Sequence, residues 1–320
     1  MSVDAPSGVP TVDVATWRTG DAAERAEIAE AVDRALRTSG FLLVTHHGVP
    51  DDLAAALRQH ASRFFALPTE AKEPYRCRVG GRGWIPPGAE SNSYAAGVAA
   101  PPDLKESFAM GHPVADAPLA PVWPSDVPEL QTTAEQYLDH VWALALDLFE
   151  IFAAALALPA GALVHHASAA ASSCNINRYP SLAVTGPPEP GQFRIGAHSD
   201  FGALTILDRQ VGYGGLQIQA LDGSWLDAPH VPGALTVNIG DMLAHWTGGR
   251  WRSTFHRVLP PSDRDPGEEL LSLVSFCGVA PSTLIETLPV EGAVARPPVL
   301  AGDYMLAKLT EIDVVDATPG

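Results

Sequence analysis

The segment Gly196–Thr205, which reads GAHSDFGALT, carries the strongest chemical signal in this chain. Its His198 and Asp200 stand two residues apart at the end of an expected strand, residues 193–198. Residues two apart in a strand point to the same face, so an imidazole and a carboxylate can converge on one point. A third ligand is available in His256, which opens another expected strand 56 residues after Asp200. These three side chains are candidate ligands of one metal ion.

The His-x-Asp spacing by itself is weak evidence, because a pair of polar residues in a solvated turn produces it more often. Two histidines and one carboxylate are nevertheless the facial triad of non-haem Fe(II) oxygenases, which leaves the opposite face of the metal open for O₂ and substrate. The residues that flank these three positions are therefore needed to distinguish a polar turn from a metal site.

Short β-like segments follow one another through the second half of the chain, and turns rich in Gly, Pro and Asp separate them. Many short antiparallel strands at this spacing indicate a sandwich or jelly roll. The expected strands are residues 175–179, 193–198, 204–207, 216–219, 234–239, 256–259 and 271–276.

The first half of the chain is more helical. Asp21 with Glu24 resembles a capping box and predicts a helix that ends before Gly40. Further helices are expected over residues 51–65 and, most clearly, 129–158, where apolar residues recur at spacings of three and four. Strands are expected at residues 9–14 and 41–45, and residues 74–128 are expected to be irregular. The fold class is therefore mainly β with a helical layer.

Composition excludes several partners. Twenty basic against 37 acidic residues give a net charge of −17, so nucleic-acid binding and docking on anionic lipid are not expected. The three widely spaced cysteines, Cys77, Cys174 and Cys277, indicate a reducing compartment. No signal peptide or membrane span is visible, and a cytoplasmic protein is expected.

Several motifs stand in register along nearly the whole chain. They are GFL at 40–42, HGV at 47–49, FFALP at 64–68, KE at 105–106, NRYP at 177–180, GGLQ at 214–217, VNIGD at 237–241, RSTFHRV at 252–258 and GDYMLAK at 302–308. Together with the triad, these motifs resemble the isopenicillin N synthase-like family of Fe(II)/2-oxoglutarate-dependent oxygenases. The resemblance implies a double-stranded β-helix, or jelly roll, wrapped by N-terminal and central helices.

The resemblance also implies a division of the chain into four segments. Residues 1–128 would form an N-terminal helical and mixed region, and residues 129–172 a long packing helix with its connection. Residues 173–280 would form the jelly-roll core, and residues 281–320 a C-terminal extension.

By the same resemblance, His198, Asp200 and His256 bind Fe(II) and carry the catalysis, with 2-oxoglutarate as co-substrate and O₂ as oxidant. Asn177 and Tyr179 match positions that lie beside 2-oxoglutarate in the family. The implied reaction is decarboxylation of 2-oxoglutarate coupled to hydroxylation, desaturation or cyclisation at a C–H bond of a small molecule, as in specialised metabolism.

One position departs from the family pattern. The distal carboxylate of 2-oxoglutarate usually meets an Arg-x-Ser pair, but here Ser272 is retained and Leu270 stands at the Arg position. A guanidinium suits a carboxylate because it binds both oxygens. Arg194, four residues before His198, is the leading candidate for the replacement cation, although a residue at a strand start could equally be exposed. Arg178 and Arg209 are weaker candidates.

Two rival functions remain open from the sequence. The loss of the Arg favours, as an alternative, an isopenicillin N synthase-type oxidase that takes all its electrons from the substrate without 2-oxoglutarate. A catalytically silent binding protein on the same scaffold is a third reading, and the intact triad argues against it. The sequence leaves the substrate, the outcome at the C–H bond and the oligomeric state open.

Overall fold

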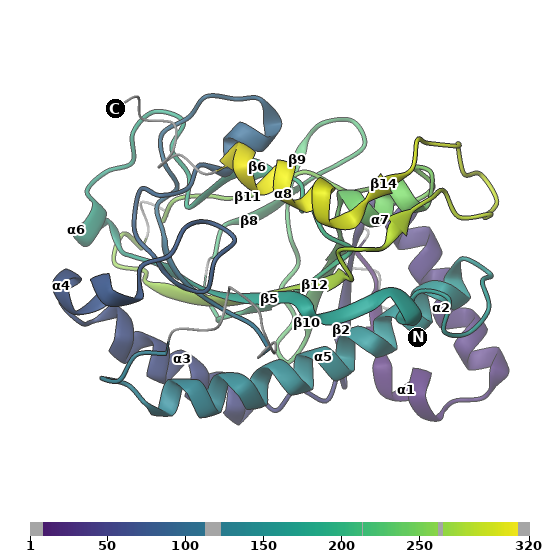
Figure 1. The fold of residues 1–320 in the computed structure, drawn as a ribbon, viewed down its shortest axis with the longest axis horizontal. Helices are drawn as coiled ribbons and strands as arrows, with labels where there is room; N and C mark the ends of the chain where they lie inside the picture. The colour runs from purple at the N-terminus through teal and green to yellow at the C-terminus, as the bar shows by residue number, and fades with distance from the viewer. Residues whose placement is uncertain (1–8, 113–122, 213, 262–264, 313–320) are drawn as a thin grey trace.

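The computed structural model describes residues 9–112, 123–212, 214–261 and 265–312 of the chain (Figure 1). The α-helices are α1 (Val14–Thr19), α2 (Ala22–Thr38), α3 (Asp51–Phe65), α4 (Thr69–Lys72), α5 (Glu129–Ala155), α6 (Leu182–Thr185), α7 (Asp241–Trp246) and α8 (Ala301–Ile312). Three 3₁₀ turns accompany them: η1 (Glu73–Tyr75), η2 (Asn92–Ala96) and η3 (Val164–His166).

The strands form two main sheets and a small hairpin. An eight-stranded sheet contains, in spatial order, β1 (Thr11–Asp13), β2 (Phe41–Thr45), β10 (Leu235–Ile239), β7 (Leu204–Arg209), β12 (Leu270–Val279), β5 (Ala167–Tyr179), β4 (Glu106–Met110) and β3 (Gly83–Ile85). A four-stranded sheet contains β6 (Ile195–His198), β11 (His256–Val258), β8 (Leu216–Gln219) and β9 (Trp225–Asp227), and the hairpin pairs β13 (Leu284–Ile285) with β14 (Val299–Leu300).

The two main sheets face each other, and the helices cover the outer side of the larger one. All strand pairs within them are antiparallel except β1 with β2. Figure 1 shows α5 and α3 along one side of β5, β12 and β10, with β6, β8, β9 and β11 on the opposite side. This is the jelly roll with a helical layer that the sequence predicts.

Two apolar cores follow from this layering. The larger core lies between the eight-stranded sheet and the helices, and α5 contributes Leu138, Ala145 and Phe152 to it. The smaller core lies between the sheets, where Leu270 of the large sheet packs with Ile218 of the small one. Tyr179, one of the residues that the sequence assigns to the co-substrate, belongs to this smaller core.

The three predicted helices, α2, α3 and α5, begin where the sequence predicts. The Asp21 side chain accepts hydrogen bonds from the amides of Ala23 and Glu24, at 2.8 and 3.0 Å, and Glu24 Oε2 accepts from the Asp21 amide, so the capping box is complete. Helix α5 is 27 residues long and buries one continuous stripe. Within the described residues, no helix is both long enough and apolar enough to cross a membrane.

Two expectations were wrong in detail. Residues 74–128 contain β3 and β4, although they were expected to be irregular. Every residue of β4 is buried, so the alternation of apolar and polar residues that marks a half-exposed strand is missing. Strand β5 also begins at Ala167, earlier than expected, because its pairing with β12 outweighs the weak β-propensity of a run of Ala and Ser.

Candidate metal centre

The three predicted ligands meet at one end of the sandwich. His198 is the last residue of β6 and His256 the first of β11, and the two are direct partners in the antiparallel pair. Partners in register present their side chains on one face, and here the ring centroids lie 4.3 Å apart. Asp200 follows β6 by two residues, and its Oδ1 lies 3.7 Å from Nε2 of each histidine. One ligand atom from each residue falls within 4.8 Å of the others.

Backbone carbonyls fix which nitrogen of each ring faces the centre. The Nδ1 of His198 lies 2.8 Å from the carbonyl oxygen of Gly196, and the Nδ1 of His256 lies 3.1 Å from that of Thr254. A carbonyl oxygen can only accept, so each Nδ1 carries the proton. Each Nε2 therefore presents its lone pair to the centre, which is how a metal-binding histidine is oriented.

The carboxylate of Asp200 is held in the same way. Its Oδ2 accepts hydrogen bonds from the Thr205 hydroxyl and from Nδ2 of Asn238, both at 2.6 Å. Oδ1 is left to face the two Nε2 atoms. Sequence reasoning missed these two positioning residues. The available signal was Asn238 itself, because a buried polar side chain inside an apolar strand needs a partner.

The charges of the site suit a divalent cation. Burial, and then the charge of His256, hold the pKa of His198 well below its usual range, so this ring is neutral at pH 7. Burial acts to raise the pKa of Asp200, but the two imidazoles and the two hydrogen bonds outweigh it and keep the pKa low. A neutral His198 and an ionised Asp200, joined by an oriented His256, form the donor set of a non-haem iron centre. Fe(II) therefore fits the residues present.

Comparisons with known proteins agree with this chemistry. Residues 9–130 match the profile of the N-terminal part of a non-haem dioxygenase in morphine synthesis, and residues 171–279 match that of the 2OG-Fe(II) oxygenase superfamily. Validamycin A dioxygenase of Streptomyces hygroscopicus subsp. limoneus is 40% identical over 311 residues, which cover 94% of this chain and 85% of that protein. This chain belongs to the 2OG-Fe(II) oxygenase superfamily.

Other members of the superfamily extend the match. The 2-oxoglutarate-dependent dioxygenase 19 of Oryza sativa subsp. japonica is 32% identical over 298 residues, covering 92% of this chain and 83% of that protein. The crystal structure of a full-length Neurospora crassa protein in complex with alpha-KG and thymine has a TM-score of 0.84 at 25% identity, covering 97% and 99% of the two chains. The oxygenase therefore uses Fe(II), O₂ and 2-oxoglutarate, and the alternative of an oxidase without a keto acid is not supported.

The residues predicted to hold 2-oxoglutarate lie together on the inner face of the large sheet. Ser272 of β12 is the register partner of Asn177 in β5, and Leu270 is that of Tyr179. Asn177 Nδ2 lies 3.5 Å from the Tyr179 hydroxyl. Burial raises the pKa of Tyr179, against the opposing effects of the Lys105 charge and of hydrogen bonds from Asn177 and Ser272. The hydroxyl therefore stays protonated at neutral pH and can donate to an oxygen.

Arg194 is fully buried, so the expectation that it could be exposed at a strand start was wrong. Its guanidinium lies 5.6 Å from the centroid of the Tyr179 ring. Nη1 donates to Oε2 of Glu268 at 2.8 Å, and Nη2 donates to the Glu268 carbonyl oxygen at 3.1 Å. Arg194 is thus in the neighbourhood of the predicted co-substrate site but already has a carboxylate partner, and its role there stays a prediction.

Arg178 does not lie on this inner face. It pairs with Glu106 and Glu269, at 2.7 and 2.9 Å, which excludes it as a free cation.

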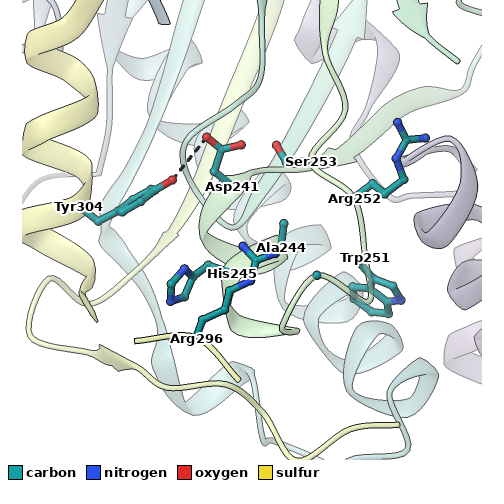
Figure 2. A pocket seen from close by; sticks show the side chains of 9 residues that line it. Asp241, Ala244, His245, Trp251, Arg252, Ser253, Arg296 and Tyr304 are labelled. Carbon is teal, nitrogen blue, oxygen red and sulfur yellow. Dashed lines mark hydrogen bonds between the residues drawn. The ribbon is translucent and has the colours of Figure 1, made fainter. Parts of the chain in front are cut away.

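A polar cavity of about 430 Å³ is lined by two residues that hydrogen-bond to the Asp200 backbone, whereas none of the three ligands lines it (Figure 2). Asp241 donates its amide to the Asp200 carbonyl oxygen at 2.7 Å, and the Ser253 hydroxyl lies 3.5 Å from the same atom. Tyr304 of α8 donates its hydroxyl to Oδ2 of Asp241 at 3.4 Å across the cavity, as Figure 2 shows. Its lining is Asp241, Ala244, His245, Gly249, Trp251, Arg252, Ser253, Arg296 and Tyr304.

Proposed function

We propose that His198, Asp200 and His256 bind a single Fe(II) ion and that Asn177, Tyr179 and Ser272 hold 2-oxoglutarate beside it. The observation that carries this assignment is the convergence of three oriented donor atoms, two Nε2 and one Oδ1, on one point. Bound iron and O₂ supply the oxidation that couples decarboxylation of 2-oxoglutarate, to succinate and CO₂, with attack on a substrate C–H bond.

The protein's own part is orientation. Gly196 and Thr254 fix the two rings through their carbonyl oxygens, and Thr205 and Asn238 fix the carboxylate. Supporting hydrogen bonds of this kind govern metal affinity and activity in other metalloenzymes.

The test is anaerobic binding. The protein loaded with Fe(II) should develop a weak visible charge-transfer band when 2-oxoglutarate chelates the metal, and the band should disappear in His256→Ala. A wild-type protein that binds iron but develops no band with 2-oxoglutarate would contradict the proposed co-substrate site.

We further propose that the substrate is a polar small molecule related to validamycin A. Support comes from the 40% identity with validamycin A dioxygenase over 94% of the chain. The cavity beside Asp200 adds to it, because its lining includes Asp241, Arg252 and Arg296 and so suits a molecule rich in hydrogen-bonding groups.

Substrate-dependent succinate formation tests this proposal with validamycin A, thymine and an apolar compound in parallel. Turnover with validamycin A well above the other two is expected. Thymine turnover without validamycin A turnover would overturn the proposal. The variant His198→Ala, assayed with the same three compounds, gives the background.

Two expectations from the sequence remain proposals. The chain is divided at residues 128, 172 and 280 into the four segments given above. A cytoplasmic location is supported by the three cysteines, all of which are free thiols.

A further inference from the structure

Position 270 contributes no charge to the co-substrate site. Leu270 is 6% exposed and belongs to the apolar cluster between the two sheets, with Tyr179 and Ile195. Its backbone is paired with Tyr179, as expected for the strand that usually carries the Arg. A dicarboxylate bound here therefore needs its positive partner from another position, because a buried carboxylate without one is costly.

Two buried cations near Tyr179 are already neutralised. The ammonium of Lys105 is bonded to Glu90, and Asp103 also acts on it. Arg194 is paired with Glu268. Recruiting either cation for a ligand would leave its own carboxylate partner buried with less compensation, so neither is well placed to act as a free anchor.

Arg209 is different in both position and partners. It ends β7 and is the direct register partner of Ser272, which is in turn the partner of Asn177. Cross-strand partners share a face, so the three side chains form one row across three neighbouring strands on the inner face of the sheet. The neighbouring Asp208 points the other way and pairs with Arg58 at 2.5 Å.

The charge of Arg209 lacks a carboxylate partner among the described residues. Its Nη1 donates to the carbonyl oxygens of Ala228 and Pro229, at 3.4 and 3.0 Å, and no acidic group of the described chain lies within ion-pair distance. Burial lowers the pKa of Arg209. A negative charge on Tyr179, if this residue were ionised, would raise the pKa of Arg209 again, because the two side chains are close enough to interact. A partly buried guanidinium held by two neutral carbonyls, and close to Tyr179, is prepared for an incoming anion.

We propose that Arg209 replaces the missing Arg of position 270 and binds the distal carboxylate of 2-oxoglutarate together with Ser272 and Tyr179. The proposal rests on the co-substrate site described under the proposed function. The cation that would bind the distal carboxylate thus lies on β7 and not on the adjacent strand β12, whereas Ser272 of β12 is retained.

The test compares two keto acids that differ only at the distal end. 2-Oxoglutarate carries the distal carboxylate, and 2-oxopentanoate has a methyl group in its place. Dissociation constants for both are measured anaerobically on the Fe(II)-loaded enzyme from the charge-transfer band. The proteins are wild type, Arg209→Gln, Arg194→Gln, and Arg209→Gln combined with Leu270→Arg.

Arg209→Gln is expected to weaken 2-oxoglutarate binding by about tenfold to a hundredfold, the usual effect of losing one charge-assisted hydrogen bond. Binding of 2-oxopentanoate should not change. Adding Leu270→Arg to Arg209→Gln should restore most of the 2-oxoglutarate affinity, because it returns the charge to the neighbouring strand.

Three results would overturn the Arg209 assignment alone. Unchanged 2-oxoglutarate binding in Arg209→Gln would exclude a direct contact. An equal loss for both keto acids would show that Arg209 acts only by holding residues 228–229. A selective loss in Arg194→Gln, absent from Arg209→Gln, would assign the contact to Arg194. A wild type that binds neither keto acid would instead refute the co-substrate site itself, and the Arg209 assignment with it.

Discussion

Replacing Thr205 by valine tests how much of the iron affinity depends on the residues behind the ligands. The change keeps the shape of the side chain but removes the 2.6 Å hydrogen bond to Oδ2 of Asp200. A hydrogen bond to a charged group contributes about 1.5–3 kcal/mol, and loss of a supporting residue behind a metal ligand typically costs about tenfold to a hundredfold in affinity. The two figures agree, so Fe(II) should bind Thr205→Val about tenfold to a hundredfold more weakly.

The effect should also depend on pH in a defined direction. Thr205 helps to keep the pKa of Asp200 below its usual value, so its removal raises that pKa. Protons compete with iron for Asp200 only as the pH approaches the pKa of this carboxyl, which lies below 3.8 in wild type, so the gap between Thr205→Val and wild type should stay constant from pH 8 to pH 6 and widen only below about pH 5. Anaerobic titration of the metal-free protein with Fe(II), at pH values on both sides of this limit, measures this.

Thr254→Val is the matched control. Thr254 is as buried as Thr205 and lies two residues from His256, but its hydroxyl has no hydrogen-bond partner among the described residues. The same isosteric change should therefore leave iron affinity at the wild-type level. Wild-type affinity in Thr205→Val, or an equal loss in Thr254→Val, would refute the role given to the hydrogen bond.

Three further predictions concern the ligands, a buried ion pair and the thiols. Alanine at His198, Asp200 or His256 should abolish iron retention and turnover while leaving the circular dichroism spectrum unchanged; a variant with stoichiometric iron would remove that residue from the triad. Lys105→Met should lower the free energy of unfolding in urea by about 3–5 kcal/mol, because Glu90 and Asp103 lose their buried partner. The control Arg34→Met, at an exposed ion pair, should lower it by less than about 0.5 kcal/mol. Similar losses in both variants would show that burial of the charge does not matter. Burial raises the pKa of Cys77 to about 11 and that of Cys174 to about 12, so iodoacetamide at pH 8 should label the native protein far more slowly than the unfolded one, and rapid native labelling counted by mass spectrometry would contradict this.

The sequence predicted the ligands because their signal is local. His198 and Asp200 are two residues apart, so a strand that continued through both would place them on one face; β6 ends at His198, and Thr205 and Asn238 hold the Asp200 carboxylate toward the histidines. The surrounding motifs supplied His256, whose pairing with His198 could not be read from spacing. Helices α2 and α5 were predictable for a similar reason, since a capping box and a periodic apolar stripe are properties of neighbouring residues.

What the sequence did not predict depends on contacts between distant segments. The partner of Arg194 is Glu268, 74 residues away, and no sequence pattern around either residue predicts this ion pair. The row that joins Asn177, Ser272 and Arg209 depends on the register of three strands, and a shift of one residue would turn each side chain to the other face. Sequence reasoning therefore ranked Arg209 below Arg194, because only the latter is close to a ligand along the chain.

The two carboxylate oxygens of Asp200 contact residues of different sheets. Oδ1 faces the histidines of the four-stranded sheet, and Oδ2 is bonded to Thr205 and Asn238 of the eight-stranded sheet. A cation held by the triad thus links the two sheets in addition to serving as the cofactor. Because a ligand that binds only the folded state stabilises it by about 2.7 kcal/mol at a hundred times its Kd, the melting temperature should rise with free Fe(II) and fall on chelation. Thermal denaturation then becomes a measure of metal occupancy that needs neither substrate nor oxygen.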